Sequence, residues 1–274
     1  LQEVVHAQIM NARRRWTLPH LERQLAHQEG CSRSQAREAI RSLIEQGVIE
    51  YTYLFGQSYL VLSFLNPVNI SPLFTIIPPG YKGDLETNRH GIAIAPGGVS
   101  FGSGRHPTTR LALQAMEKGW YHLRSYRPFS FQSALDIGTG SGVLAIAAFC
   151  LGAERVMALD IDPCARSEAR RNIEANPGAA TAITVSDTPL ESIEKRFDMI
   201  IANLRLPTLI QLSKWIPSQL QPKGCVVVSG LREDEWGRLR ACYDRKRFHA
   251  LWQGGMAGWT AGLLCPMDKA GPPV

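Results

Sequence analysis

Short apolar runs alternate with longer amphipathic segments along the last two thirds of the chain. The apolar runs predict strands at 133–137, 155–159, 182–185, 199–202, 225–229, 248–252 and 260–265. The segments between the earlier runs predict helices at 143–151, 164–175 and 206–220. This alternation is typical of an α/β fold, in which helices cover a mostly parallel sheet. A Gly-rich loop at 254–258 joins the last two runs, so we expect them to pair antiparallel at the edge of a seven-stranded sheet.

The beginning of the chain has another pattern, which predicts a small α+β domain over 1–64. Apolar spacing predicts helices at 1–14 and 18–28, and strand-like runs lie at 48–54 and 58–63. Ser32 and Gln35 fit a capping box that begins a third helix, which ends at Gly47. Three helices followed by a two-stranded hairpin resemble a winged helix-turn-helix.

The third helix of that domain would carry Arg33, Arg37 and Arg41 on its outer face, with Gln35 near its start. This set suits phosphate contacts and base readout in a DNA groove. However, seven arginines and six glutamates precede residue 51, which leaves a net charge of only +1. Winged helices also dock proteins, so nucleic acid and protein both stay open as partners of this domain.

Composition sets broad limits on the whole chain. The 274 residues include 30 Lys and Arg against 24 Asp and Glu, and a net charge of +6 permits an anionic partner without requiring one. Six scattered cysteines form neither a disulfide framework nor a metal site, which favours a reducing, cytoplasmic location. The longest apolar run, 143–153, is too short for a membrane span. A Pro- and Gly-rich segment at 65–104, with short strands at 74–77 and 91–95, predicts a linker into the larger domain.

The strongest local signal is a Gly-rich turn that follows the 133–137 strand. It holds Gly138, Gly140 and Gly142, with Thr139 between the first two and Asp136 just before them. Glycines allow a tight turn and let a ligand approach the backbone. The helix that follows offers free amides to a carboxylate. These residues are candidates for binding a nucleoside-containing cofactor.

A second acid supports that interpretation. Asp160 ends the next strand, where a carboxylate can accept both hydroxyls of a ribose, and Ile161 follows it. Val143 replaces the last glycine of the dinucleotide-type turn. That replacement and Asp136 resemble enzymes that use S-adenosylmethionine (SAM) rather than NAD. The alternative is that the three glycines only form a turn.

A segment upstream carries a more specific resemblance. Residues 96–109 spell P-G-G-V-S-F-G-S-G-R-H-P-T-T, which resembles the P-G-x-x-F-G-x-G-x-H-P-T-T loop of the PrmA family. Members of that family methylate amino groups of the eleventh protein of the large ribosomal subunit. The resemblance implies that Thr108, with Phe101 and His106, contacts the methionine end of SAM. The alternative is that Thr108 only caps a helix.

A third match lies at 197–207, where F-D-M-I-I-A-N-L-R-L-P resembles the family's strand ending in V-A-N-I-L. The resemblance places Asn203 beside the reactive methyl group, as both a catalytic and a cofactor-binding residue. Arg205 departs from the family by replacing an apolar residue. By the same resemblance, Asp187 and Thr188 lie near the adenine ring, although both also suit an ordinary turn.

The resemblance extends from about Phe74 to the end of the chain and implies a Rossmann-like class I methyltransferase domain over 105–274 that binds SAM. It does not cover the winged-helix-like domain, which stands where the family has another substrate-binding domain. The predicted function is SAM-dependent N-methylation of a protein amino group. Alternatives are a nucleic-acid or small-molecule methyltransferase and a SAM-sensing DNA-binding regulator, and a homodimer is possible in the small-molecule class.

Overall fold

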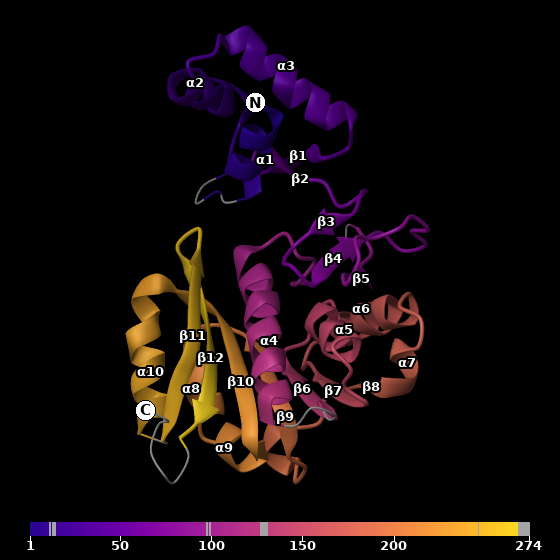
Figure 1. The fold of residues 1–274 in the computed structure, drawn as a ribbon, viewed down its shortest axis with the longest axis vertical. Helices are drawn as coiled ribbons and strands as arrows, with labels where there is room; N and C mark the ends of the chain where they lie inside the picture. The colour runs from indigo at the N-terminus through magenta and orange to yellow at the C-terminus, as the bar shows by residue number, and fades with distance from the viewer. Residues whose placement is uncertain are drawn as a thin grey trace. The chain divides into compact units, whose positions relative to one another are not determined.

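The computed structural model describes residues 1–10, 12, 15–96, 98, 100–126, 131–245 and 247–267. The chain forms two compact units, residues 1–68 and 69–274, which are described separately below (Figure 1).

The N-terminal unit contains three helices followed by a hairpin. The helices are α1 (Gln2–Met10), α2 (Leu18–Glu29) and α3 (Arg33–Glu45), and the hairpin strands are β1 (Ile49–Leu54) and β2 (Gln57–Leu62). The predicted capping box begins α3, because Ser32 Oγ accepts from the Gln35 amide and the Gln35 side chain accepts from the Ser32 amide. Apolar side chains from all three helices form the core, among them Val5, Leu21 and Ile40, which are fully buried. This order of elements is the one that the sequence predicts, and the resemblance to a winged helix-turn-helix stays a prediction.

The second unit begins with a small sheet and continues into a large one. The small sheet has the order β3-β4-β5, from β3 (Val68–Asn69), β4 (Phe74–Ile77) and β5 (His90–Ala93). The large sheet has seven strands in the order β11-β12-β10-β9-β6-β7-β8. Their bounds are β6 (Ser133–Ile137), β7 (Arg155–Leu159), β8 (Ile183–Ser186), β9 (Phe197–Asn203), β10 (Leu220–Arg232), β11 (Phe248–Met256) and β12 (Trp259–Pro266).

Strand direction in the large sheet follows the sequence pattern. Strands β10, β9, β6, β7 and β8 are parallel, whereas β12 runs antiparallel to both β10 and β11. The predicted α/β fold with a seven-stranded sheet is therefore confirmed, and the last two strands form the predicted edge pair. Their connection is shorter than predicted, because pairing continues to Met256 and Trp259 and leaves only Ala257 and Gly258 in the turn.

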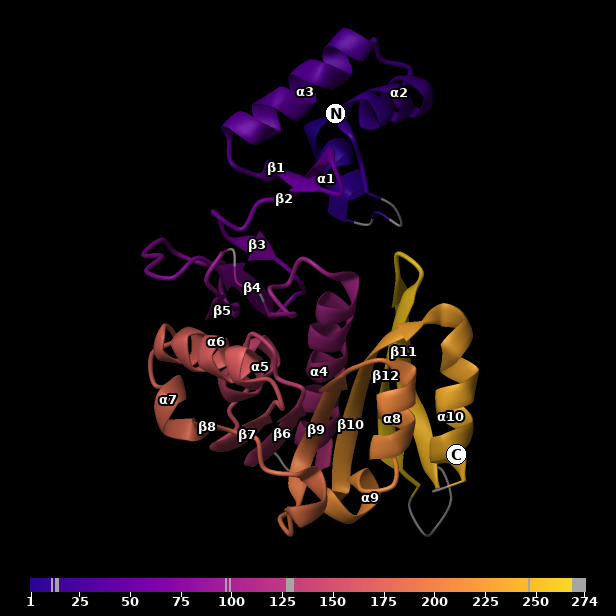
Figure 2. The same cartoon turned by 180° about the vertical axis from the view of Figure 1, so that it is seen from behind.

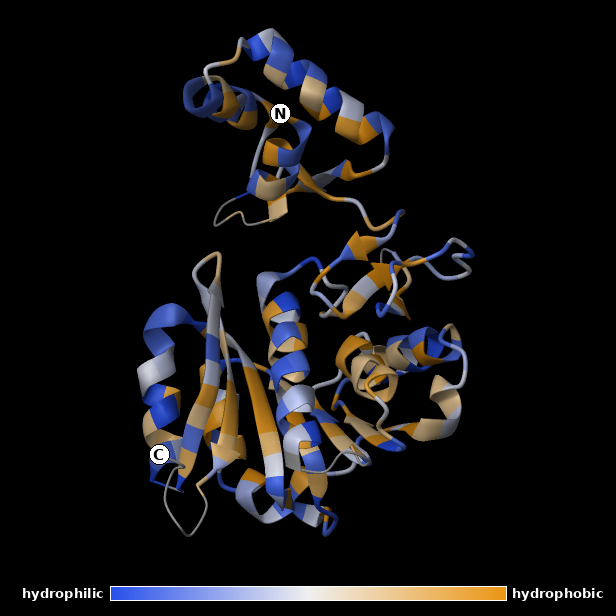
Figure 3. Ribbon diagram, in the orientation of Figure 1, coloured by the Kyte–Doolittle hydropathy of each residue, from blue (hydrophilic) through white to orange (hydrophobic). Residues whose placement is uncertain are grey.

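Helices cover both faces of this sheet. They are α4 (Pro107–Tyr126), α5 (Val143–Cys150), α6 (Pro163–Glu174), α7 (Ala179–Ala182), α8 (Leu206–Leu212), α9 (Ile216–Gln219) and α10 (Trp236–Asp244). The two opposite views place α4 and α8 on opposite faces (Figures 1 and 2). Apolar strands lie between these helices (Figure 3), and one buried cluster joins Leu209 of α8 and Leu239 of α10 to Val226 and Ile200 of the sheet. Burial of apolar surface on both faces is the main source of stability in this arrangement.

Two helices differ from the sequence prediction. The predicted helix at 206–220 is two short helices, α8 and α9, because a turn separates them and Pro217 lies in the first turn of α9. Proline has no amide hydrogen to bond to the preceding turn, so a continuous helix is disfavoured there. The long helix α4 was not predicted, although it packs against four strands of the sheet.

No helix in the described part of the chain is both long enough and apolar enough to cross a membrane.

Candidate functional site

The Gly-rich turn lies at the carboxyl end of β6 and is held against neighbouring segments. The amides of Gly138 and Thr139 both donate to the Leu159 carbonyl at 2.8 Å. Gly140 has φ 54°, and a Cβ atom on it would lie 2.3 Å from the Phe101 carbonyl oxygen. Only glycine fits at this position, because a side chain would meet backbone. The turn therefore brings backbone amides close to any ligand at this edge of the sheet.

Asp136, the last residue but one of β6, has a fully buried carboxyl group. Its Oδ2 accepts a hydrogen bond from Thr139 Oγ1 at 2.6 Å, and its Oδ1 has no hydrogen-bond partner among the described residues. Burial raises the pKa of Asp136 to about 7, against the opposing effects of Thr139 and the backbone at Ala145. An unpartnered buried oxygen costs free energy, so this group is suited to receive a donor from a ligand.

Asp160 follows β7 and ties two turns together. Its Oδ2 accepts from the Gly140 amide at 2.9 Å, and its Oδ1 accepts from the Asp162 amide at 3.0 Å. The neighbouring Ile161 is 94% exposed. An isolated apolar side chain next to a carboxylate at the end of a parallel strand provides a surface on which a flat ring can pack.

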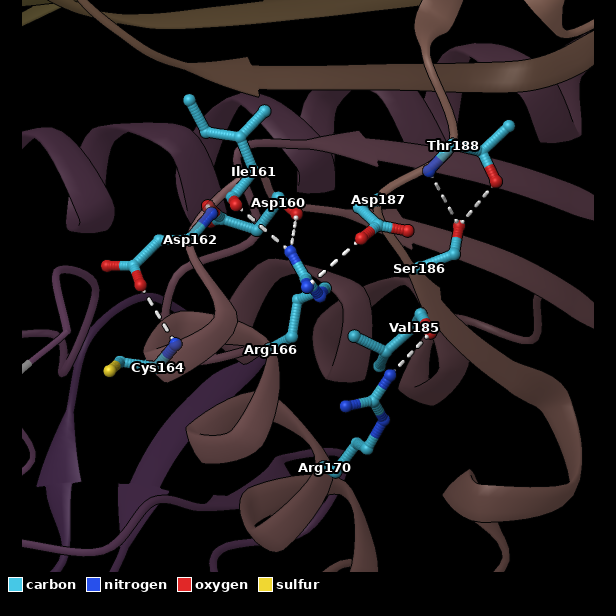
Figure 4. Close-up of polar contacts among 10 residues, drawn as sticks. All are labelled: Asp160, Ile161, Asp162, Cys164, Arg166, Arg170, Val185, Ser186, Asp187 and Thr188. Carbon is cyan, nitrogen blue, oxygen red and sulfur yellow. Dashed lines mark hydrogen bonds and ion pairs between the residues drawn. The ribbon is translucent and has the colours of Figure 1, made fainter.

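Asp187 and Thr188 lie beyond the end of the adjacent strand, β8. The Asp187 carboxylate forms an ion pair with Arg166 at 3.0 Å, and Arg166 also donates to the backbone carbonyls of Asp160 and Ile161 (Figure 4). The Thr188 hydroxyl and amide both contact Ser186 Oγ. Arg166 thus links the ends of β7 and β8 and fixes the positions of both predicted acids.

The loop at 100–104 is anchored on the Gly-rich turn and on α6. The Phe101 carbonyl accepts from the Ser141 amide at 3.0 Å, and the buried Glu168 carboxylate of α6 accepts from the Ser100 amide at 3.0 Å. Asn172 follows Glu168 by one helical turn, and it donates to the Ser141 carbonyl at 2.8 Å. The Phe101 ring itself is 53% exposed. The loop backbone is therefore fixed while its aromatic ring stays accessible.

Further along this segment, His106 lies among aromatic and cationic groups. Its ring centroid is 5.0 Å from that of Phe101 and 4.8 Å from that of Trp259. The Arg232 guanidinium lies over the Trp259 ring, 3.8 Å from the centroid of that ring. Burial, Arg232 and Arg110 all lower the pKa of His106, so the imidazole is neutral at pH 7.

Thr108 connects this cluster to the strand ends. The helix α4 begins at Pro107, so Thr108 lies inside its first turn and is not its N-cap. The Thr108 amide donates to His106 Nδ1 at 3.3 Å, and the Thr108 carbonyl accepts from Ser229 Oγ at 2.8 Å. Ser229 is the partner of Asn203 in the pairing of β10 with β9.

Asn203 ends β9, one residue beyond the pair that β9 makes with Ile137 of β6. Its Oδ1 atom is buried and has no hydrogen-bond partner among the described residues. The next residue, Leu204, packs closely on Gly138: a Cβ atom added to Gly138 would lie 2.6 Å from the Leu204 side chain. Asn203 therefore lies beside the Gly-rich turn, with an acceptor atom that the protein itself does not use.

The sequence model of one family, "Ribosomal protein L11 methyltransferase (PrmA)", matches residues 60–263, about three quarters of the chain. The chain belongs to this family.

Curated relatives and a solved structure agree with the PrmA assignment. The chain is similar to the ribosomal protein L11 methyltransferase of Streptococcus pneumoniae, with 34% identity over 68% of this chain and 56% of that protein. It is 37% identical to that of Geobacter over 60% of this chain and 50% of that protein. A crystal structure of the ribosomal protein L11 methylase from Lactobacillus delbrueckii matches 73% of this chain and 98% of that one, with 27% identity and a TM-score of 0.64. The chain thus spans about half the length of the curated relatives it matches.

Relative to this PrmA-type site, sequence reasoning found the residues on the turns and missed several that hold them. In the structure Asp136 accepts from the Thr139 side chain, and Asp160 accepts from the Gly140 amide, so both acids contact the Gly-rich turn. The polar face of α6, the Trp259–Arg232 pair and the buried Arg110, which donates to the Gly104 carbonyl, were not predicted. One available signal was the spacing of Glu168 and Asn172, which lie four residues apart on α6, with Asn176 four residues further on, just beyond the end of the helix.

Proposed function

We propose that this protein is a SAM-dependent methyltransferase that methylates an amino group of a protein. Membership of the PrmA family supports the reaction class, and the relatives are named for methylating ribosomal protein L11. The observation that carries the proposal is the buried, unpartnered Oδ1 of Asn203 beside the Gly-rich turn. A protein that only senses SAM would not need an acceptor atom next to the cofactor.

The residues present fit SAM along its whole length. The unpartnered Oδ1 of Asp136 suits the ammonium group of the methionine portion, with Thr108 and Phe101 on the loop side. The turn from Gly138 to Gly142, including Thr139, supplies backbone that SAM can approach closely. Asp160 suits the ribose hydroxyls, while the exposed Ile161, with Asp187 and Thr188, suits the adenine ring. When bound, SAM supplies an electrophilic methyl group carried on a sulfonium.

On the acceptor side, Asn203 would orient the incoming amine. Its Oδ1 can accept one N–H of a neutral amine and thereby fix the direction of the nitrogen lone pair. Alignment of reacting atoms is the main contribution that a protein makes to a displacement with a good leaving group. Asn203 is accordingly assigned as the catalytic residue of this site.

His106 is not suited to act as the base that removes the amine's proton. Thr108 already occupies His106 Nδ1, because its amide donates to that nitrogen at 3.3 Å and its Oγ1 lies 2.9 Å from it. An ammonium group has a pKa of about 10.4 when free. Arg232 and Arg110 lie close enough to His106 to lower its pKa, and the same positive charges favour an amine that arrives neutral.

The acceptor itself is proposed at the level of a protein amino group. The matched region begins at residue 60, so the N-terminal helices lie outside it, and we propose that this unit selects the acceptor. We also propose that the enzyme acts in the cytoplasm. Nucleic acid as a partner of this unit stays a hypothesis, as does a homodimer, which light scattering would test.

Incubation with methyl-labelled SAM tests the proposed function. The full chain is mixed with lysate from its own source, and protein, nucleic acid and small molecules are separated before counting. We expect label in protein, released as methylated lysine or α-amine after acid hydrolysis, and about a hundredfold slower labelling with the Asn203→Ala variant. Label confined to nucleic acid or to small molecules, with SAM binding verified by calorimetry, would overturn the choice of acceptor.

The raised pKa of Asp136 predicts that SAM affinity depends on pH. The ammonium group of SAM favours the Asp136 carboxylate, but that carboxyl has a pKa of about 7 in the free protein and holds a proton at lower pH. We expect the dissociation constant to fall about tenfold between pH 6 and pH 8, as for one group that must ionise before binding.

The contribution of Asp136 to the folding stability of the free protein has the opposite pH dependence. Between about pH 4 and pH 7 the unfolded chain releases a proton that the folded state keeps, so this group's contribution to stability falls as pH rises.

Calorimetry at pH 6 and pH 8 measures this dependence. The Asp136→Asn variant cannot ionise and is the matched control, for which we expect weaker but pH-independent binding. Equal affinity of the unmodified protein at both pH values would contradict the assignment.

A further inference from the structure

Three aromatic rings and one guanidinium lie in a row between the loop at 100–104 and the strand pair β10–β12. The exposed ring of Phe101 contacts the His106 ring, which in turn contacts the ring of the half-buried Trp259. Arg232 and Trp259 are direct partners in the pairing of β10 with β12, and the guanidinium covers the Trp259 ring. These four side chains are here called the aromatic–arginine row.

Thr108 links this row to the end of β9. Its amide donates to His106 Nδ1 at 3.3 Å, and its carbonyl accepts from Ser229 Oγ at 2.8 Å. Ser229 is the pairing partner of Asn203, the residue proposed to orient the incoming amine. The row therefore lies on the acceptor side of the site, where groups of the acceptor that adjoin the amine can reach it.

Arg232 keeps the hydrogen-bonding edge of its guanidinium free. Stacking on Trp259 uses the flat face of this group, whereas its N–H groups point outward in the plane. Arg232 is exposed and forms no ion pair within the part of the chain that the structure describes. Two acids that follow it have other contacts, because Glu235 accepts from the Arg232 amide and Glu233 lies along Gly255. A planar fork held in place by stacking is suited to bind a carboxylate through two parallel hydrogen bonds.

A second arginine lies at the end of the neighbouring strand. Arg205 follows β9, is exposed, and has no acid partner among the described residues. The Leu204 amide donates to the Ser229 carbonyl at 3.0 Å, and a Cβ atom on Gly230 would lie 2.4 Å from the Leu204 carbonyl oxygen. The segments that carry Arg205 and Arg232 therefore leave the sheet side by side.

We propose that Arg232 binds a carboxylate of the acceptor, the side chain of an aspartate or glutamate next to the amine that is methylated, and that Arg205 strengthens this attraction. The inference rests on the proposed function, because it takes the acceptor to be a protein. Two unpaired cations beside the site repel an ammonium group, and a carboxylate next to the amine offsets this repulsion. The apolar stem of the acceptor can pack on the exposed ring of Phe101.

The charges around Arg232 favour one carboxylate over a polyanion. Glu233, Asp234 and Glu235 follow it directly in the sequence. These acids would repel the repeated phosphates of a nucleic acid, whereas one carboxylate needs only the edge of a single guanidinium. The proposed contact is therefore local and selects one acidic residue of the acceptor.

Peptide binding to the full chain tests this proposal by fluorescence anisotropy. S-adenosylhomocysteine, the demethylated cofactor, is present, so no methyl transfer is needed and the outcome is separate from that of the labelling assay. Two labelled peptides with blocked ends each contain one lysine, which is flanked by glutamate in one peptide and by glutamine in the other. We expect the glutamate peptide to bind about tenfold more tightly, the effect of one charge-assisted hydrogen-bonded contact.

Variants assign this preference to the arginines. Arg232→Gln is expected to bind both peptides equally, and Arg232→Lys, which keeps the charge but loses the fork, to retain a smaller preference. Arg205→Gln is expected to reduce the preference without removing it. Arg155→Gln is the matched control, because Arg155 is exposed at the amino end of β7, away from the carboxyl ends that form the site. It should leave the preference unchanged, and circular dichroism and SAM binding verify that each variant folds.

Several outcomes would overturn the proposal. Equal binding of the two peptides by the unmodified protein, or binding of neither, would show that no carboxylate is selected. A preference that persists in Arg232→Gln would place the contact elsewhere. Displacement of the glutamate peptide by single-stranded RNA at lower concentration would identify phosphate as the ligand, and displacement by free lysine would indicate a small-molecule acceptor. If the glutamate peptide binds as expected and lysate protein takes up no label, the proposed function alone fails.

Discussion

Replacement of Asp160 by alanine is expected to weaken SAM binding at least a hundredfold. In the proposed complex this carboxylate accepts both ribose hydroxyls, and hydrogen bonds to a charged group contribute about 1.5–3 kcal/mol each. The free protein adds a second cost, because Asp160 also accepts from the amides of Gly140 and Asp162 and so holds the Gly-rich turn in place. Both effects act in the same direction. Titration calorimetry with SAM measures the change.

Two further variants separate these effects. Asp160→Asn keeps one acceptor oxygen and the shape of the side chain, so we expect an intermediate affinity. Asp187→Ala removes a neighbouring acid whose side chain is 67% exposed and paired with Arg166, and we expect a loss of only severalfold. If Asp160→Ala bound SAM as tightly as the unmodified protein does, the ribose assignment would be wrong. If Asp187→Ala caused the larger loss, the main acidic contact would lie at the end of β8.

The turns of this site were predictable because their signals are local. A continuous apolar strand, a Gly-rich turn and a helix follow one another in the sequence around Gly138. Because β6 and β7 are parallel neighbours, their carboxyl ends meet at the same edge of the sheet, and Asp160 lies at that edge. Central strands such as β6 and β9 were predicted for the same reason, since strands buried on both faces are uninterrupted apolar runs. Their bounds differ from the structure mainly where β10 and β11 extend into polar or Gly-rich residues.

The supports of the site were not predictable, because they join residues far apart in the chain. Glu168 and Asn172 bind backbone that lies 68 and 77 residues away, and no local pattern identifies those partners. Trp259 faces His106 only because β12 runs antiparallel to β10, a register that apolar spacing does not specify. The helix α4 was missed although it packs against the sheet, because its start lies inside a motif that was interpreted for its chemistry.

Replacement of Asn203 by alanine is expected to lower turnover about a hundredfold while SAM affinity changes less than twofold. The Oδ1 atom is buried and unpartnered, so in the proposed reaction its only role is to orient the amine that attacks the methyl group. Removal of one oriented hydrogen-bond partner from a reacting group typically costs about 10²–10³ in turnover. The contacts proposed for the nucleoside come from the residues that follow β7 and β8, whereas Asn203 ends β9, so its side chain is not required for them. Steady-state kinetics with the identified acceptor, together with calorimetry for SAM, measure the two quantities separately.

The neighbouring Arg205 provides a matched comparison. It is exposed, two residues further along, and stands where the PrmA family has an apolar residue. If it contacts the acceptor outside the reacting atoms, Arg205→Ala should raise KM for the acceptor and leave kcat largely unchanged. Asn203→Ala should do the reverse, because an orienting contact acts on the reacting nitrogen itself. Normal turnover in Asn203→Ala, or a loss of SAM affinity as large as its loss of turnover, would show that Asn203 does not orient the amine. The acceptor atom left unpartnered at the end of β9 would then need another explanation.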